Sequence, residues 1–219
     1  MAILTLVRRA RRGWDGAVTN DAVALVVVDM QEAFLDPWWG PTTNHPDCEE
    51  NVERLLDGWR RRGLPIVLVR HDSVHADSPL HPGHPGNRLM PLADVPADLL
   101  VTKSVNSAFY GEPDLEVWLR GRGIDRIVVC GIQTNMCVET TSRMGGNLGL
   151  DVTVPLDATR TFDLTGPDGT TIPAATLMQV TAANLHGDGF ARVTSTDAVL
   201  RDLGEKTGSA PAQEVAATG

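Results

Sequence analysis

Cys137 lies where an apolar run gives way to a helical pattern, a position at which a cysteine can act as a nucleophile. It follows the run at 125–131, DRIVVCG, within the segment GIQTNMCVETT at 131–141. With Thr134 as the N-cap, Cys137 would be the third residue of the helix. Because a helix N-terminus stabilises a thiolate, we expect the pKa of Cys137 to be lowered. The alternative is a small core residue, as most free cysteines are.

Asp29 and Lys103 also end apolar runs, AVALVVVD and DLLVTK. In open α/β sheets, side chains just beyond the carboxyl ends of strands form the site. A thiol nucleophile needs a base, which Asp29 could supply, and a cation beside it, which Lys103 could supply. Alone, Asp29 could equally cap a turn and Lys103 could be a solvent-exposed lysine. Together with Cys137 they predict acyl-transfer chemistry, with helix amides stabilising an oxyanion.

The elements that would position these residues alternate between two hydrophobic patterns. Continuous apolar runs, typical of strands buried on both faces, occur at 22–29, 64–71 and 125–131, with a weaker one at 150–157. The segment at 189–194 is expected to be an edge strand. Helical stripes lie between them at 46–63, 113–123 and 173–187. Strand followed by helix, repeated along the chain, predicts an α/β sheet with right-handed crossovers.

The helical stripe at 46–63 also indicates whether Cys48 is a core residue or a residue of the site. Cys48 falls on the apolar face of this predicted helix, and Cys130 falls within a strand end, so both are predicted core residues. Asp47 followed by Glu50 predicts a capping box, and Gly63 before Pro65 predicts the end of the helix. Cys137 is the cysteine left for chemistry.

The whole composition indicates one globular domain and excludes some partners. The 219 residues are 42% hydrophobic and 21% charged, with a net charge of -9, and this acidic balance argues against nucleic acid. No apolar run is long enough to cross a bilayer, and the N-terminus lacks the order of a signal peptide. Three cysteines without metal-like pairing argue against a disulfide framework, so we expect a cytoplasmic protein. The expected parts are an N-terminal arm at 1–20, one domain at 21–203 and a flexible tail at 204–219.

Three blocks in order resemble the isochorismatase-like cysteine hydrolases: VVVDMQEAF, VTKSVNSAFYG and GIQTNMCVETTSRMGGNLGLDVTVPLDAT. The resemblance runs from about residue 22 to about residue 194. It implies a three-layer, doubly wound fold with a mainly parallel, six-stranded sheet. It also implies a catalytic triad of Asp29 as base, Lys103, and Cys137 as nucleophile, working without a cofactor. A cis peptide at Ile132–Gln133 would turn the Gln133 amide toward the Cys137 amide to form the oxyanion hole.

The activity implied is hydrolysis of an amide, carbamoyl or lactam C–N bond of a small molecule through a thioester. N-carbamoylsarcosine amidohydrolases, ureidoacrylate and biuret hydrolases and streptothricin hydrolases belong to this branch, whose members usually form homodimers or homotetramers. One alternative is a vinyl-ether hydrolase of the isochorismatase type, which Cys137 disfavours. Another is a non-catalytic homologue that binds a small molecule, which the presence of Asp29 and Lys103 disfavours.

Family position also suggests residues near the opening and bears on whether a metal is bound. The candidates for substrate binding are Gln31, Phe34, Trp38, Phe109, Tyr110 and Phe162. Each aromatic residue among them could instead be core or interface packing. The loop VRHDSVHADSPLHPGHPG holds four histidines, His71, His75, His81 and His84, but lacks the Asp-x-His spacing of metal-binding relatives. Its many Pro and Gly residues indicate an irregular loop that these histidines anchor, so we expect no bound metal.

Overall fold

The computed structural model describes residues 22–40 and 45–206. A central sheet runs in the order β3-β2-β1-β4-β5-β9, and a short strand, β6, pairs with β4. Every pair in this sheet is parallel. The strands are β1 (Val23–Val28), β2 (Ile66–His71), β3 (Leu99–Lys103), β4 (Arg126–Ile132), β5 (Asp151–Pro155), β6 (Thr159–Arg160) and β9 (Arg192–Thr194). The predicted α/β class is confirmed.

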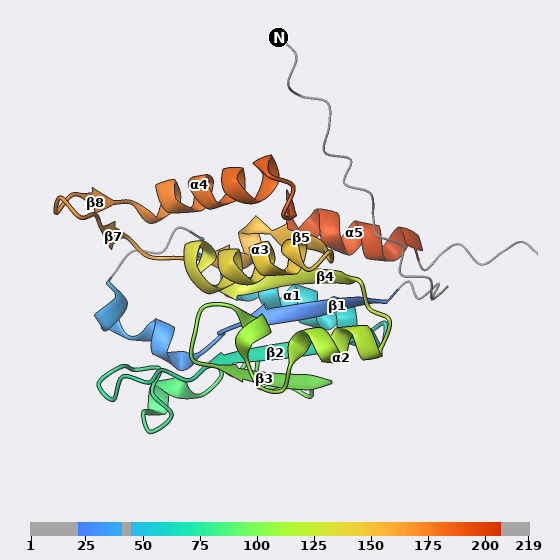
Figure 1. Cartoon of the computed structure of the whole chain (residues 1–219), viewed down its shortest axis with the longest axis horizontal. Coiled ribbons are helices and arrows are strands. Elements are labelled where there is room, and N and C mark those ends of the chain that lie inside the picture. Colours follow the sequence, from blue (N-terminus) through green and yellow to red (C-terminus); the bar gives the residue numbers. More distant parts are fainter. Residues whose placement is uncertain (1–21, 41–44, 207–219) are drawn as a thin grey trace, which may run out of the picture.

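Helices cover both faces of the sheet, which makes three layers (Figure 1). One face carries α1 (Cys48–Arg60) and α5 (Thr196–Lys206). The other carries α2 (Leu115–Gly121), α3 (Glu139–Asn147) and α4 (Ala174–Gly187). The shorter elements are η1 (Glu32–Leu35), η2 (Pro37–Trp39), η3 (Pro85–Asn87), η4 (Ala108–Tyr110), η5 (Thr134–Val138), η6 (Leu156–Ala158), β7 (Leu164–Thr165) and β8 (Thr171–Ile172). The β7–β8 hairpin projects beyond the sheet at the left of Figure 1.

Burial on both faces explains why the strands are continuous apolar runs. All six residues of β1 are buried, with alternate side chains contributing to the two cores on either side of the sheet. The chain builds β2 and β3 on one side of β1 and then crosses to place β4 on the other side. The order of strands therefore reverses between β1 and β4, and such a switch point is where α/β folds form their sites.

Helix α1 confirms the predicted stripe and corrects the predicted cap. Cys48, Val52 and Trp59 are all fully buried, and Gly63 ends the helical region with a φ of 60°. The capping box is wrong: Asp47 is the N-cap, but its side chain accepts no capping hydrogen bond. Its ψ of 10° departs from the extended backbone from which a capping side chain reaches the first turn.

The C-terminal boundary of the folded region also differs from the expected one. Helix α5 continues to Lys206, so residues 204–206, which were expected in the tail, are helical. The remaining tail and the expected N-terminal arm lie outside the described residues. Among the helices that are described, none combines the length and the apolar character needed to cross a membrane.

Candidate active site

Four neighbouring strands bring one polar side chain each to the same edge of the sheet. His71 and Lys103 are the last residues of β2 and β3 and lie opposite each other in the register. Asp29 follows β1 directly, and Cys137 lies in η5, just after β4. Because β1 pairs with both β2 and β4, these strand ends converge. The sequence expectation that Asp29, Lys103 and Cys137 come together therefore matches their positions.

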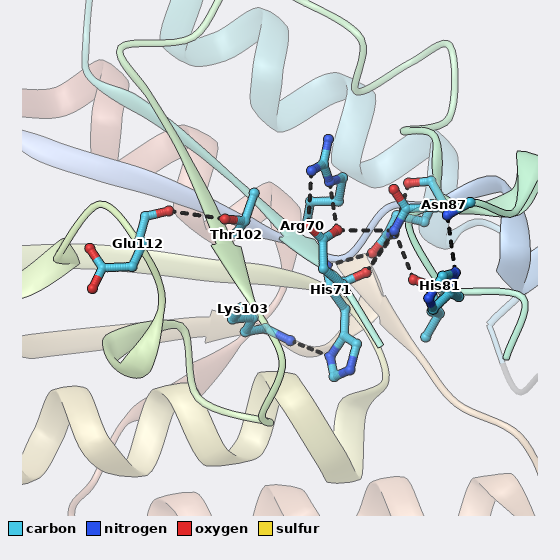
Figure 2. A network of polar contacts seen from close by, with 11 residues as sticks. Arg70, His71, His81, Asn87, Thr102, Lys103 and Glu112 are labelled. Atoms are coloured by element: carbon cyan, nitrogen blue, oxygen red, sulfur yellow. Dashed lines mark hydrogen bonds and ion pairs between the residues drawn. The ribbon is translucent and has the colours of Figure 1, made fainter. Parts of the chain in front are cut away.

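The ammonium group of Lys103 lies at the centre of this cluster. Its Nζ donates to Asp29 Oδ2 at 2.7 Å and to Cys137 Sγ at 3.2 Å. It also lies 3.0 Å from Nδ1 of His71, and Figure 2 shows the lysine side chain pointing at that ring. The side chains of Lys103 and Asp29 are fully buried, so their ion pair is not screened by water.

Asp29 combines an unusual backbone with a free carboxylate oxygen. Its φ of 50° lies in the left-handed region, which costs a residue other than glycine about 1–2 kcal/mol. Its amide donates to Val69 O, which anchors it to β2. Within the described residues, its buried Oδ1 has no hydrogen-bond partner. A fixed carboxylate with an unoccupied acceptor oxygen can take up a proton.

Cys137 corrects the expectation of a low pKa. Burial raises the pKa of the Cys137 thiol well above its usual range, and the negative charge of Asp29 raises it further, while Lys103 lowers it. Cys137 is only 7% exposed, so the loss of hydration outweighs the nearby positive charge. A raised pKa favours the thiol over the thiolate. It also lies within donating distance of the exposed residue Asn106, with Sγ 3.9 Å from Oδ1.

The turn that carries Cys137 also differs from the predicted one. Gln133, not Thr134, is the N-cap, and the turn η5 is a π-helix. The carbonyl of Gln133 accepts from the amides of both Met136 and Val138. The hydroxyl of Thr134 donates instead to Thr159 Oγ1 in β6, at 2.9 Å. Because the hydroxyl of Thr134 is hydrogen-bonded to Thr159 in β6, Thr134 does not cap the helix.

The peptide bond between Ile132 and Gln133 is cis. Gly131, two residues before Gln133, has a φ of 115°, and a Cβ built on it would lie 2.0 Å from Val28 O. The backbone of β4 therefore approaches the end of β1 more closely than any side chain permits. This close approach brings η5 beside Asp29.

His71 belongs to the cluster, and the sequence analysis assigned it only to loop anchoring. Its side chain faces Lys103 rather than the loop. The signal that would have found it is the rule that selected Asp29 and Lys103: His71 ends the second apolar run. Its main chain is held by the buried amide of Gln31, whose Oε1 accepts from His71 N and whose Nε2 donates to His71 O.

The same geometry bears on metal binding. Single ligand atoms of Asp29, His71 and Cys137 lie within 4.8 Å of one another, a grouping that could hold a metal ion. The Nζ of Lys103 is within hydrogen-bond distance of all three residues, so an ammonium ion already serves as their common cation. His81 and His84 anchor the loop, as predicted, because each Nδ1 accepts an amide two residues later.

The residues suggested for substrate binding fall into different environments. Gln31 is fully buried, and its amide nitrogen donates to backbone oxygens of both His71 and Asn87. This engagement makes Gln31 a support for the end of β2. Tyr110 is 69% exposed, whereas Phe109 is half-buried against the α2, α3 and α4 side of the sheet. Trp38 lies in η2, and its side chain is outside the described structure.

The remaining aromatic candidates form a compact group on the other side of the sheet. Phe34 and Phe162 are both 5% exposed and stack with ring centroids 6.2 Å apart. Trp39 contacts both rings, at 4.8 Å and 5.9 Å. The guanidinium of Arg160, which donates to Glu49, lies over the Phe162 ring. Contact of this aromatic group with a substrate stays a prediction.

A separate cavity of about 270 Å³ lies at the opposite edge of the sheet. Its walls include Val23, Arg126 and Asp151, the first residues of β1, β4 and β5. The cluster around Lys103 lies at the carboxyl ends of these strands, so this cavity is separate from the candidate active site.

Comparison with known proteins shows which proteins this chain is similar to in sequence and in fold. A family model described as the isochorismatase domain matches residues 23–199. The uncharacterized isochorismatase family protein YrdC of Bacillus subtilis is 37% identical over 181 residues, covering 82% of this chain and 95% of its own. The ureidoacrylate amidohydrolase RutB of Methylorubrum extorquens is 32% identical, covering 59% of this chain and 66% of its own. A solved structure of an isochorismatase-family protein from Chromobacterium violaceum has a TM-score of 0.79 at 39% identity, covering 86% and 96% of the two chains.

Proposed function

Because the chain belongs to the isochorismatase family of hydrolases, we propose that it cleaves a C–N bond of a small amide, carbamoyl or lactam compound through a thioester on Cys137. One observation carries the proposal. Lys103 Nζ lies 2.7 Å from Asp29 Oδ2 and 3.2 Å from Cys137 Sγ, while Asp29 Oδ1 accepts no hydrogen bond among the described residues. A nucleophile, a proton acceptor and a fixed cation are thus held in one buried cluster.

The first step is attack by the thiol with transfer of its proton. Since the pKa of Cys137 is raised by burial and by Asp29, Sγ keeps its proton until a substrate is present. Asp29 accepts that proton as Sγ forms a bond to the carbonyl carbon and the C=O electron pair moves to oxygen. The amides of Gln133 and Cys137 are the proposed donors to this oxyanion. Lys103 stays protonated and offsets the negative charge of the cluster.

The second half of the reaction releases the two products. The tetrahedral intermediate collapses, the C–N bond breaks, and Asp29 returns its proton to the departing nitrogen. A water then attacks the thioester carbon and gives a proton to Asp29. Collapse of that second intermediate breaks the C–S bond, releases the acid and returns the proton to Cys137. The cycle needs no redox step and no added group.

The amide class is supported by the relative RutB, which is named an amidohydrolase, and by the thiol itself. The vinyl-ether reaction that gives the family its name needs no covalent acyl group. The buried thiol of Cys137, which accepts a hydrogen bond from Lys103, has no evident use in that reaction. We expect the residues that select among amides to include Asn106, whose Oδ1 lies 3.9 Å from Cys137 Sγ, and the group of Phe34, Trp39 and Phe162.

The experiment is a panel of primary amides, carbamoyl compounds and lactams, with ammonia release and product mass as readouts. The wild type should hydrolyse at least one class, and intact-mass measurement should find a transient adduct on Cys137. Cys137→Ala should abolish turnover, whereas Cys48→Ala should lower the stability of the protein and leave its turnover unchanged. Turnover that survives Cys137→Ala, or hydrolysis of a vinyl ether alone, would refute the proposal.

A further inference from the structure

Lys103 has three hydrogens on its ammonium group and three neighbours to receive them. Two go to Asp29 Oδ2 and Cys137 Sγ, and the third points at Nδ1 of His71, 3.0 Å away. An ammonium group donates hydrogen bonds and accepts none. Nδ1 of His71 must therefore be the acceptor, so the ring is neutral and carries its hydrogen on Nε2.

The protein fixes the position of this ring through its backbone. Gln31 receives a hydrogen bond from His71 N at 2.8 Å and donates one to His71 O at 3.0 Å. Asn87 donates to the same carbonyl at 3.1 Å and also to Leu80 O at 2.8 Å (Figure 2). Gln31 follows Asp29 by two residues, so the end of β1 supports both the carboxylate and the histidine on either side of Lys103.

We propose that His71 is a positioning residue, which as a neutral imidazole accepts the third hydrogen bond of Lys103 and so orients the ammonium toward Asp29 and Cys137. A lysine side chain rotates freely about its terminal bonds unless its donors are occupied. With His71 as the third acceptor, the other two hydrogens stay on the carboxylate and the sulfur. The kinetic consequences rest on the proposed function, but the effect on the thiol does not.

Protonation of His71 would remove this support. The titratable and charged groups around the ring are Lys103 on β3, Asp29 after β1, Cys137 in η5, and Asp72, which pairs with Arg70, on its own segment. Burial lowers the pKa of His71 and the charge of Lys103 lowers it further, against the opposite effect of Asp29 and Asp72. Above about pH 6.5, the ordinary pKa of histidine, the ring is therefore neutral. It becomes protonated as the pH falls through the lowered pKa of His71. Activity should fall on the same acid limb.

Two substitutions separate positioning from simple packing. His71→Ala removes the acceptor. His71→Asn keeps one, because Oδ1 of asparagine is attached to Cγ just as Nδ1 of histidine is, and it cannot be protonated. His75→Asn is the matched control, since His75 is an exposed histidine in the loop that follows.

The kinetic measurement is kcat and KM from pH 5 to pH 9 on the substrate found above. His71→Ala should lower kcat about tenfold, which corresponds to ~1.4 kcal/mol, with little change in KM. His71→Asn should recover most of kcat and should lose the acid limb that the wild type and His75→Asn share. If His71→Asn keeps that acid limb, or if His71→Ala retains wild-type kcat, the proposal is wrong.

The second measurement needs no substrate. The rate at which iodoacetamide alkylates Cys137, followed against pH by peptide mapping, reports how well Lys103 stabilises the thiolate. The midpoint should move to higher pH in His71→Ala and return toward the wild-type value in His71→Asn. Thermal melts check that each variant is folded. If His71→Ala does not fold, the test is whether His71→Asn loses the acid limb of the kcat profile. An unchanged alkylation midpoint in folded His71→Ala would overturn the positioning role, even if an amide substrate had been found. A shifted midpoint would support the positioning role, even if no amide substrate had been found.

Discussion

Lys103 carries the positive charge around which Asp29, Cys137 and His71 are arranged. Its side chain and that of Asp29 are both fully buried, with 2.7 Å between Nζ and Oδ2. A buried ion pair of this kind adds little net stability, but removing one partner leaves a charge without compensation. The pair is therefore more informative about function than about stability, and each half can be tested separately.

Asp29→Asn should keep the fold and remove most of the activity. Asparagine tolerates the left-handed backbone at this position, and its Oδ1 can still accept from Lys103. It cannot carry a proton, so kcat should fall by about 10²–10⁴-fold. The measurement is kcat on the confirmed substrate beside a thermal melt, with Asp77→Asn as a control on an exposed aspartate. Near-wild-type turnover would exclude Asp29 as the base.

Lys103→Met should destabilise the protein by about 3–5 kcal/mol at pH 7, because the carboxylate of Asp29 would stay buried without a cation. Combining Lys103→Met with Asp29→Asn should restore much of the stability at pH 7. Urea unfolding at pH 7 measures Lys103→Met, Asp29→Asn and the double variant. A double variant no more stable than Lys103→Met would show that packing, not charge, explains the loss.

At the scale of elements, the approach of β4 to β1 decides where Cys137 lies. Val28 and Gly131 are opposite each other in the register, just before Asp29 on one strand and before η5 on the other. Gly131 permits this contact because it has no Cβ, and its φ of 115° is open to glycine but strained for other residues. The pairing of Thr134 with Thr159 then holds η5 against β6.

Gly131→Ala should therefore separate the ends of β1 and β4 and abolish activity, with a stability loss well above that of a strained φ alone. Gly149→Ala is the matched control, because its φ of 86° is equally unsuited to alanine while the space around it is open. The control should cost about 1–2 kcal/mol and keep full turnover. Denaturant unfolding and kcat distinguish the two. Equal losses of stability in both variants would contradict the steric role of Val28 O.

At the scale of the whole molecule, a doubly wound sheet places its chemistry at one edge and leaves the other for stability. The reversal of strand order between β1 and β4 creates the opening at the carboxyl ends. The cavity of about 270 Å³ at the amino ends is lined by side chains of both charges and lies across the sheet from Cys137. The histidine-containing loop after β2 continues from His71, and its residue Asn87 donates to the carbonyl of His71.

Exhaustive chelation should leave activity intact. Lys103 supplies the cation that Asp29, His71 and Cys137 share, and the Nδ1 atoms of His81 and His84 already accept amide hydrogen bonds. Dialysis against EDTA and then phenanthroline, followed by the turnover assay and metal analysis, checks this. Activity that is lost and then returns on addition of zinc or iron would mean that a metal takes part.

The sequence by itself determined the α/β fold, the helix α1 and the convergence of Asp29, Lys103 and Cys137. These follow from local patterns: apolar runs specify strands buried on both faces, and polar residues at the ends of parallel strands share one edge. The roles of base, cation and nucleophile remain predictions that the proposed variants test. The resemblance of three sequence blocks to a known family added the expected reaction class.

Only the tertiary structure decided the state of the thiol and the part played by His71. The raised pKa of Cys137 comes from desolvation, which depends on how distant elements pack around Sγ and on Asp29, 108 positions earlier in the chain. The contact of His71 with Lys103 depends on the register of β2 with β3 and on the amide of Gln31 that holds the end of β2. Neither is encoded in a local pattern, because pairing and burial are properties of the assembled sheet.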